Sequence, residues 1–112
     1  MTSTTFTDVE EKAVNELKKS LKELLGNRLI SLTLFGSRAR GDFDVNSDID
    51  IAVIVRGLTR DLKNQVLDRV AKIEFDFVTP LSVLVLSEDD FNFLKKRERR
   101  IALDIVEQGV TL

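Results

Sequence analysis

The sequence predicts an α/β (α+β) fold in which a small mixed β-sheet is flanked by helices. Segments with apolar residues at helical spacing alternate with short β-prone runs, in the order α-β-turn-β-α-β-α. Cap residues precede each helical segment. The chain has 112 residues, of which 43% are hydrophobic and 32% charged, which is typical of one globular domain spanning residues 1–112.

The first segment predicts a helix over residues 8–25. Thr7 followed by Glu10 is the pattern of a capping box, and Gly26 offers a stop. The apolar residues at helical spacing are Val9, Ala13, Val14, Leu17, Leu21, Leu24 and Leu25. We therefore expect one face of this helix to pack against the sheet.

Two strands are expected on either side of a polar connection. Residues 29–35 alternate and are β-prone, and a Gly-Ser pair ends that strand. Residues 37–41 are compatible with a short helical turn, and residues 42–47 with a polar loop. Residues 48–55 become almost entirely apolar, which indicates a strand buried on both faces.

The second half of the chain predicts two more helices and a third strand. Thr59 and Ser87 are the expected helix caps. The expected elements are a helix over 60–74, a strand over 81–86, a helix over 88–107 ended by Gly109, and a short edge strand over 110–112.

Composition excludes several kinds of chemistry. The chain has no Cys and no His, so it has no disulfide, no thiolate or imidazole metal site and no Ser-His-Asp catalysis. A bound metal must sit among oxygens, which favours magnesium, manganese or calcium. The net charge of -2 argues against general binding to nucleic acid. No segment resembles a signal peptide or a membrane span, so we expect a cytoplasmic protein without membrane contact.

Asp48 and Asp50 are the candidate metal ligands. Two residues apart in a strand, they project from the same face, with Cα atoms roughly 6.5 Å apart. Two carboxylates at this separation repel one another, and burial increases the repulsion unless a proton or a cation intervenes. A pair on a rigid strand suits one or two Mg²⁺ ions.

Gly36 and Ser37 are the candidate phosphate-binding residues. Glycine allows the backbone to approach a ligand closely. Backbone N–H groups at this turn, together with the Ser37 hydroxyl, can cradle a phosphate. If the two flanking strands are neighbours, a triphosphate can bridge the Gly-Ser turn and a metal on the Asp pair.

The combination of Gly36-Ser37, ten intervening residues and Asp48-Ile49-Asp50 resembles the signature of the polymerase-beta-like nucleotidyltransferase superfamily. The run GSRARGDFDVNSDIDIAV is similar to its minimal, single-domain branch. The resemblance implies a palm-like fold and transfer of a nucleoside monophosphate, AMP above all, from a magnesium-bound triphosphate to a hydroxyl. It also implies nucleotide binding by Gly36 and Ser37 and metal binding by Asp48 and Asp50. Minimal members often serve as antitoxin partners of HEPN-domain ribonucleases, some by adenylylating the toxin.

One feature of the superfamily pattern is missing from the expected third strand. A full site of this kind has a third carboxylate on a later strand, but residues 81–86 contain no acid. Asp76 is the nearby candidate, if residues 73–78 form a strand rather than the end of a helix. Without a third acid, nucleotide binding can persist while transfer is weak or lost. The alternative to an enzyme is therefore a degenerate nucleotide-binding or antitoxin module that acts by protein contact.

Other residues have competing interpretations. Arg38 and Arg40 either steer phosphates or a partner, or are solvated charges on a short helix. Asp42 and Asp44 are expected to be solvated loop residues, and the basic run over residues 95–100 a solvated helix face rather than a contact for RNA. Core packing is favoured over base stacking for Phe75, Phe77, Phe91 and Phe93. A chain of this size leaves no room for a second domain to select the acceptor, so a partner protein or a homo-oligomer would complete the substrate site.

Overall fold

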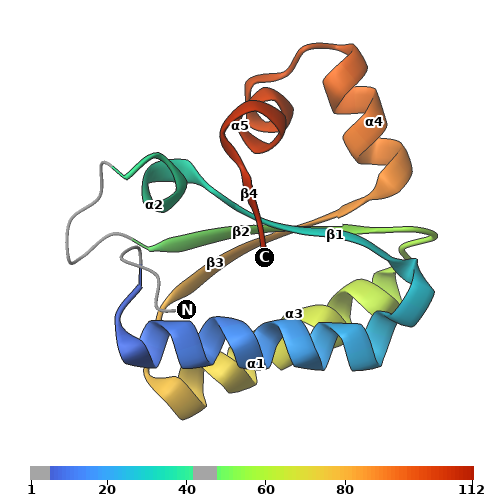
Figure 1. Ribbon diagram of the computed structural model, residues 1–112. Helices are drawn as coiled ribbons and strands as arrows, with labels where there is room; N and C mark the ends of the chain where they lie inside the picture. Colours follow the sequence, from blue (N-terminus) through green and yellow to red (C-terminus); the bar gives the residue numbers. More distant parts are fainter. Residues whose placement is uncertain (1–5, 42–47) are drawn as a thin grey trace.

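A computed structural model describes residues 6–41 and 48–112, which form a four-stranded mixed sheet with helices on both faces (Figure 1). The first helix and the first strand have the bounds that the sequence predicts. In chain order the elements are α1 (Asp8–Leu25), the 3₁₀ turn η1 (Gly26–Arg28), β1 (Leu29–Phe35), α2 (Gly36–Arg40), β2 (Ile49–Val55), α3 (Arg60–Phe77), β3 (Leu81–Ser87), α4 (Glu88–Lys96), α5 (Arg100–Gln108) and β4 (Val110–Thr111).

The strand order is β3-β2-β1-β4, with β2 in the interior of the sheet. β1 pairs antiparallel with both β2 and β4, whereas β2 and β3 run parallel. Residues Ile51–Val55 of β2 are all buried, as the continuous apolar run predicts for a strand covered on both faces. The short C-terminal edge strand is also confirmed, because Thr111 and Val110 pair with Thr33 and Leu34.

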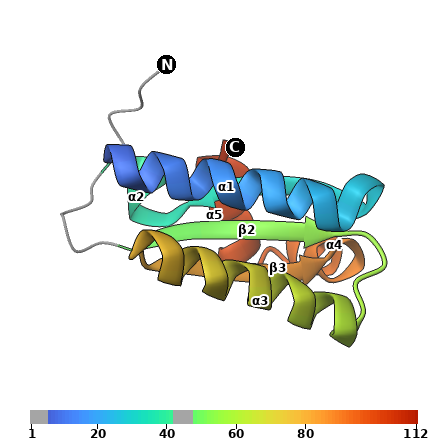
Figure 2. The ribbon, with the colours of Figure 1, turned by 90° about the horizontal axis from the view of Figure 1, so that it is seen from below.

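Helices α1 and α3 lie side by side across one face of the sheet (Figure 2). The capping box of α1 is present, since the Thr7 side chain accepts a hydrogen bond from Glu10 N–H and the Glu10 side chain accepts one from Thr7 N–H. Leu17 and Leu21 are completely buried between this helix and the sheet. Alternate residues of β2 face the same core, which includes Ile49, Ile51, Val53 and Val55.

Helices α2, α4 and α5 lie on the opposite face of the sheet (Figure 1). The prediction of one helix over 88–107 was wrong, because the chain turns between α4 and α5. Glu98 adopts a left-handed backbone conformation with φ 53°, and the Arg99 N–H bonds the Leu94 carbonyl oxygen at 3.0 Å. A left-handed residue of this kind commonly ends a helix, and glycine is the residue most often found in that position. The turn allows α5 to fold back over β1.

Helix α3 extends three residues beyond the predicted end at residue 74. The alternating stretch around Asp76 is helical because Phe77 packs against the core one turn after Ile73. Core packing was the wrong interpretation for Phe75 and Phe93, which are 78% and 58% exposed. No helix in the described part of the chain is long and apolar enough to span a bilayer.

Candidate active site

The pairing of β1 with β2 brings together the two halves of the motif. Phe35 of β1 pairs with Asp50 of β2, so the next residue, Gly36, lies beside the Asp50 carboxylate. A Cβ atom placed on Gly36 would lie 3.1 Å from Cγ of Asp50, closer than most real contacts of this kind. Gly36 also has φ 75°, a left-handed conformation that favours glycine. The turn therefore needs glycine both for its backbone and for close approach to Asp50.

Asp50 points toward the face of the sheet that carries α2. Its neighbours Ile49 and Ile51 are buried in the core on the α1 and α3 face, and side chains alternate along a strand. Asp48 is exposed, and its charge is close enough to act on Asp50. The two acids are therefore close enough to interact, and Asp50 lies beside the Gly-Ser turn. The position of Asp48 relative to that turn stays a prediction.

Burial raises the pKa of the Asp50 carboxyl above its ordinary value of 3.8. A hydrogen bond from the Ser82 side chain acts in the opposite direction, the negative charge of Asp48 raises the pKa further, and the positive charge of Arg40 lowers it. The ionised form of Asp50 thus carries a net cost in the protein alone. A cation between the two carboxylates would remove that cost, and their oxygens are of the type that Mg²⁺ prefers. Among the residues described, no group of three or more acidic side chains is arranged around a metal position.

Ser82 occupies the position on β3 directly beside Asp50 in the parallel register. Ser82 could not be predicted as part of the site, because a serine in an apolar strand carries no signal until the register is known. Asp76 cannot take the place of a third acid there. It lies on helix α3, on the opposite side of the sheet from the Asp50 side chain, and forms an ion pair with Lys72 at 3.0 Å.

The two arginines of α2 lie in different surroundings. Arg38 is 4% exposed and forms two hydrogen bonds to the Glu10 carboxylate, at 2.9 and 2.8 Å, so the interpretation of it as a solvated charge was wrong. Arg40 is exposed, donates to the side chain of Gln108 at 3.3 Å and acts electrostatically on Asp50. Its position beside the carboxylates is compatible with a role in binding phosphate. Asp42 and Asp44 lie outside the described residues.

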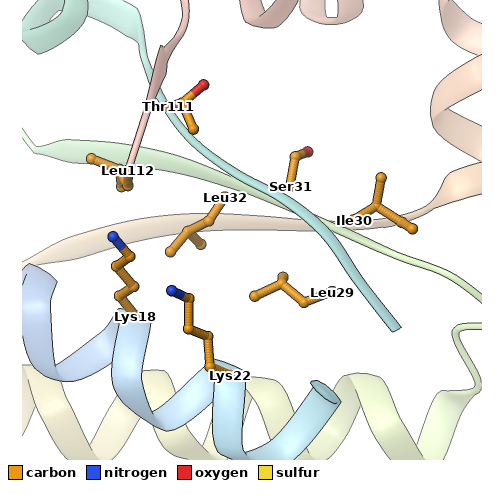
Figure 3. Close-up of a pocket in the computed structure, with 8 residues that line it drawn as sticks. All are labelled: Lys18, Lys22, Leu29, Ile30, Ser31, Leu32, Thr111 and Leu112. Atoms are coloured by element: carbon orange, nitrogen blue, oxygen red, sulfur yellow. The ribbon is translucent and has the colours of Figure 1, made fainter. Parts of the chain in front are cut away.

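A hollow of about 190 Å³ lies elsewhere, between α1, the first residues of β1 and the C-terminal residues. Figure 3 shows Lys18 and Lys22 extending from α1 toward the sheet and Leu112. The residues around this hollow include neither the Gly-Ser turn nor the Asp pair. The basic run over residues 95–100, interrupted by Glu98, is exposed at the α4–α5 corner, where Lys95 and Arg97 lie over the rings of Phe91 and Phe93, respectively.

Comparison with known proteins identifies relatives over most of the chain. Residues 14–108 match the family described as nucleotidyltransferase domain. A Methanocaldococcus jannaschii protein named as a protein adenylyltransferase is 36% identical over 103 residues, which are 92% of this chain and 97% of that protein. Spectinomycin 9-adenylyltransferase of Staphylococcus aureus is 29% identical over 99 residues, 80% of this chain but 38% of that enzyme.

Solved structures agree with these matches. A crystal structure of a toxin–antitoxin with AMP-PNP is 25% identical and superposes with a TM-score of 0.55, covering 87% of this chain and 69% of that chain. A mutant of the MntA-HpeT toxin–antitoxin complex, at 22% identity and a TM-score of 0.54, shares the fold over the same fraction. On the family match, the near full-length relative and the shared architecture, this chain belongs to the nucleotidyltransferase domain family and is a nucleotidyltransferase.

Proposed function

We propose that this chain transfers AMP from magnesium-bound ATP to a hydroxyl group on a partner protein. In this proposal Asp48 and Asp50 are the catalytic residues and the metal ligands, and Gly36 and Ser37 bind the triphosphate. The observation that carries the proposal is the contact between Gly36 and the half-buried Asp50 carboxylate. The backbone turn that we propose binds phosphate lies directly beside this carboxylate, whose pKa is raised by burial.

The residues of the chain act mainly by positioning and by electrostatics. The backbone at Gly36 and the hydroxyl of Ser37 hold phosphate oxygens, and the charge of Arg40 lies on the same side of the sheet. Bound Mg²⁺ would supply charge stabilisation for the attacking and leaving oxygens. The acceptor oxygen forms a bond to the α-phosphorus while the bond between that phosphorus and the oxygen bridging to the β-phosphate breaks. Pyrophosphate leaves, and the proton of the acceptor hydroxyl is released to solvent water.

The choice of AMP and of a protein acceptor is supported by the relatives. Two of them are named adenylyltransferases, one of these a protein adenylyltransferase of nearly the same length. A structural neighbour is a toxin–antitoxin whose crystal contained AMP-PNP. We therefore propose a toxin as the partner, of the HEPN class that the sequence resemblance implies. A partner or a second copy would supply the acceptor-binding surface, because the described elements are used to build the sheet and its helical covers.

The test is a calorimetric titration of the chain with ATP, GTP, CTP and UTP, each with and without Mg²⁺. We expect ATP to bind only when the metal is present. Transfer is then measured with α-labelled ATP and the co-expressed partner, with Asp48→Asn and Asp50→Asn as test variants and Asp68→Asn, an exposed site on α3, as the control. Each test variant should lose transfer by on the order of a hundredfold or more. Equal labelling by wild type and Asp50→Asn would exclude the proposed roles.

Ser82 favours one alternative, a module that binds nucleotide and silences its partner by contact alone. The strand beside Asp50 carries a hydroxyl where an acid could have stood. In that case the Asp48→Asn and Asp50→Asn variants would still bind and neutralise the partner, and the partner would carry no added mass. A mass spectrum of the partner isolated with wild type separates the two functions, since only an enzyme leaves an AMP group on it.

A further inference from the structure

Helix α2 carries the Gly-Ser turn but has little stability of its own. It is five residues long, and the residue before it provides no side-chain cap. Both ends are glycines in left-handed conformations, Gly36 with φ 75° and Gly41 with φ 83°. Glycine at both ends leaves the backbone free to take other directions. Contacts between its side chains and the rest of the fold therefore help to set the orientation of α2.

Arg38 joins this short helix to the start of α1. Its two terminal nitrogens donate to the two carboxylate oxygens of Glu10, at 2.9 and 2.8 Å, in the bidentate geometry that fixes direction as well as distance. The arginine is 4% exposed and the Glu10 side chain 17% exposed, so the pair is largely shielded from water. The two residues are 28 positions apart, so the contact joins separate parts of the chain.

Glu10 is itself held firmly at a second point. The oxygen that accepts from Arg38 Nη1 also accepts the backbone N–H of Thr7 at 2.9 Å, which completes the capping box of α1. Helix α1 is anchored in the core by fully buried side chains such as Leu17. The Glu10 carboxylate therefore connects α1, on one face of the sheet, to α2 and its Gly-Ser turn on the other face.

We propose that Glu10 and Arg38 are positioning residues, which hold the Gly36-Ser37 turn at the separation from Asp50 that a triphosphate requires. The proposal rests on the proposed function. Ser37 immediately precedes Arg38, and Gly36 contacts Asp50, so any movement of Arg38 is passed directly to the phosphate-binding backbone. Without the Glu10 charge, the buried guanidinium loses its bidentate carboxylate partner, and a shift of Arg38 toward water would carry α2 with it. A displacement of about 1 Å at such a turn can cost on the order of a hundredfold in rate.

Glu10→Gln tests the ion pair without removing the helix cap, because glutamine also serves in a capping box. We expect the dissociation constant for ATP with Mg²⁺ to rise about tenfold or more. Hydrogen exchange at the Gly41 amide, which bonds the Ser37 carbonyl at 2.9 Å, should become faster while the amides of β2 stay protected. The matched control is Glu88→Gln, which breaks the exposed pair of Glu88 with Arg56 and should change neither measurement.

A second variant separates positioning from a simple loss of stability. In Glu10→Gln/Arg38→Met no buried charge remains unpaired, so the free energy of unfolding should recover, but the bidentate contact that fixes the direction of α2 is still missing. The ATP affinity and the Gly41 protection of this double variant should therefore stay reduced. If Glu10→Gln binds ATP as wild type does, or if the double variant recovers both its stability and its ATP affinity, the positioning role is excluded. Failure of wild type itself to bind ATP with Mg²⁺ would instead overturn the proposed function, and the positioning role with it.

Discussion

At the scale of single residues, the site depends on one glycine beside one carboxylate. Gly36 has the backbone conformation that a turn needs and leaves the space that the Asp50 side chain occupies. The sequence predicts both residues as functional, because Gly-Ser and Asp-x-Asp appear at a spacing that two neighbouring strands bring together. The role of Ser82 could not be predicted, since it depends on the parallel register between β2 and β3.

The close contact at Gly36 can be measured against a second glycine. Gly36 and Gly41 both have positive φ, so alanine at either should cost about 1–2 kcal/mol of stability from the backbone alone. Only at Gly36 would the new methyl group meet Asp50, whereas nothing lies within 4 Å at Gly41. Urea unfolding should therefore show a larger loss for Gly36→Ala than for Gly41→Ala. Equal losses would mean that the carboxylate moves away without cost.

Val78 is another residue in an unusual conformation. This β-branched side chain ends α3 with φ 49° and is 88% exposed, so it gains little from packing. Val78→Gly should raise the free energy of unfolding by about 1 kcal/mol, because glycine adopts the left-handed conformation without strain. Val106→Gly is the control, since this exposed valine lies inside α5, where glycine should lower stability by about 0.5 kcal/mol. A loss of stability in Val78→Gly would contradict the explanation.

At the scale of elements, the sequence predicts those features that depend on neighbouring residues in the chain. The capping box at Thr7 and Glu10 marked the start of α1, and the apolar run after Asp50 marked β2 as an interior strand. The corner at Glu98 was missed, because a glutamate takes the left-handed position where glycine would have signalled a helix end. The burial of Arg38 was missed for a different reason: its partner lies 28 residues away, beyond any local pattern.

The connection between α1 and α2 should weaken in acid. Hydrogen bonds from Arg38 hold the pKa of the Glu10 carboxyl below its ordinary value of 4.5. A carboxyl with a lowered pKa in the folded state contributes its full stability above the unfolded-state pKa and loses it as the pH falls through the folded-state pKa. Between about pH 5 and pH 2, the free energy of unfolding should therefore fall more steeply for wild type than for Glu10→Gln. If the free energies of unfolding of wild type and Glu10→Gln, measured with urea, change in parallel with pH, the pair contributes nothing to stability.

At the scale of the whole molecule, the two helical layers differ in what they do. Helices α1 and α3 cover one face with a continuous apolar core, and α2, α4 and α5 lie on the other face. The family match over residues 14–108 includes helices and strands of both layers. The alternation of helical and β-prone segments was enough to predict the layered fold. The position of Asp50 beside the turn follows from the pairing of Phe35 with Asp50.

Nucleotide binding should be visible as stability of the whole domain. A ligand that binds only the folded state at one hundred times its dissociation constant adds about 2.7 kcal/mol to the free energy of unfolding. We expect ATP and Mg²⁺ together to raise the melting temperature of wild type, and each alone to have little effect. Asp48→Asn should abolish the shift, and Asp68→Asn, on an exposed surface of α3, should retain it. A shift of equal size in both variants would place the nucleotide elsewhere.

The double use of the Glu10 carboxylate also has a consequence for how this sequence can diverge. One side chain caps a helix and neutralises a buried guanidinium, so Glu10 can be exchanged freely only if Arg38 is exchanged as well. Among descendants of a common ancestor, positions 10 and 38 should therefore change in concert, while the exposed pair of Arg56 and Glu88 drifts independently. Glu10 lies outside the nucleotide motif, yet its substitutions would then be limited by the motif residue Arg38.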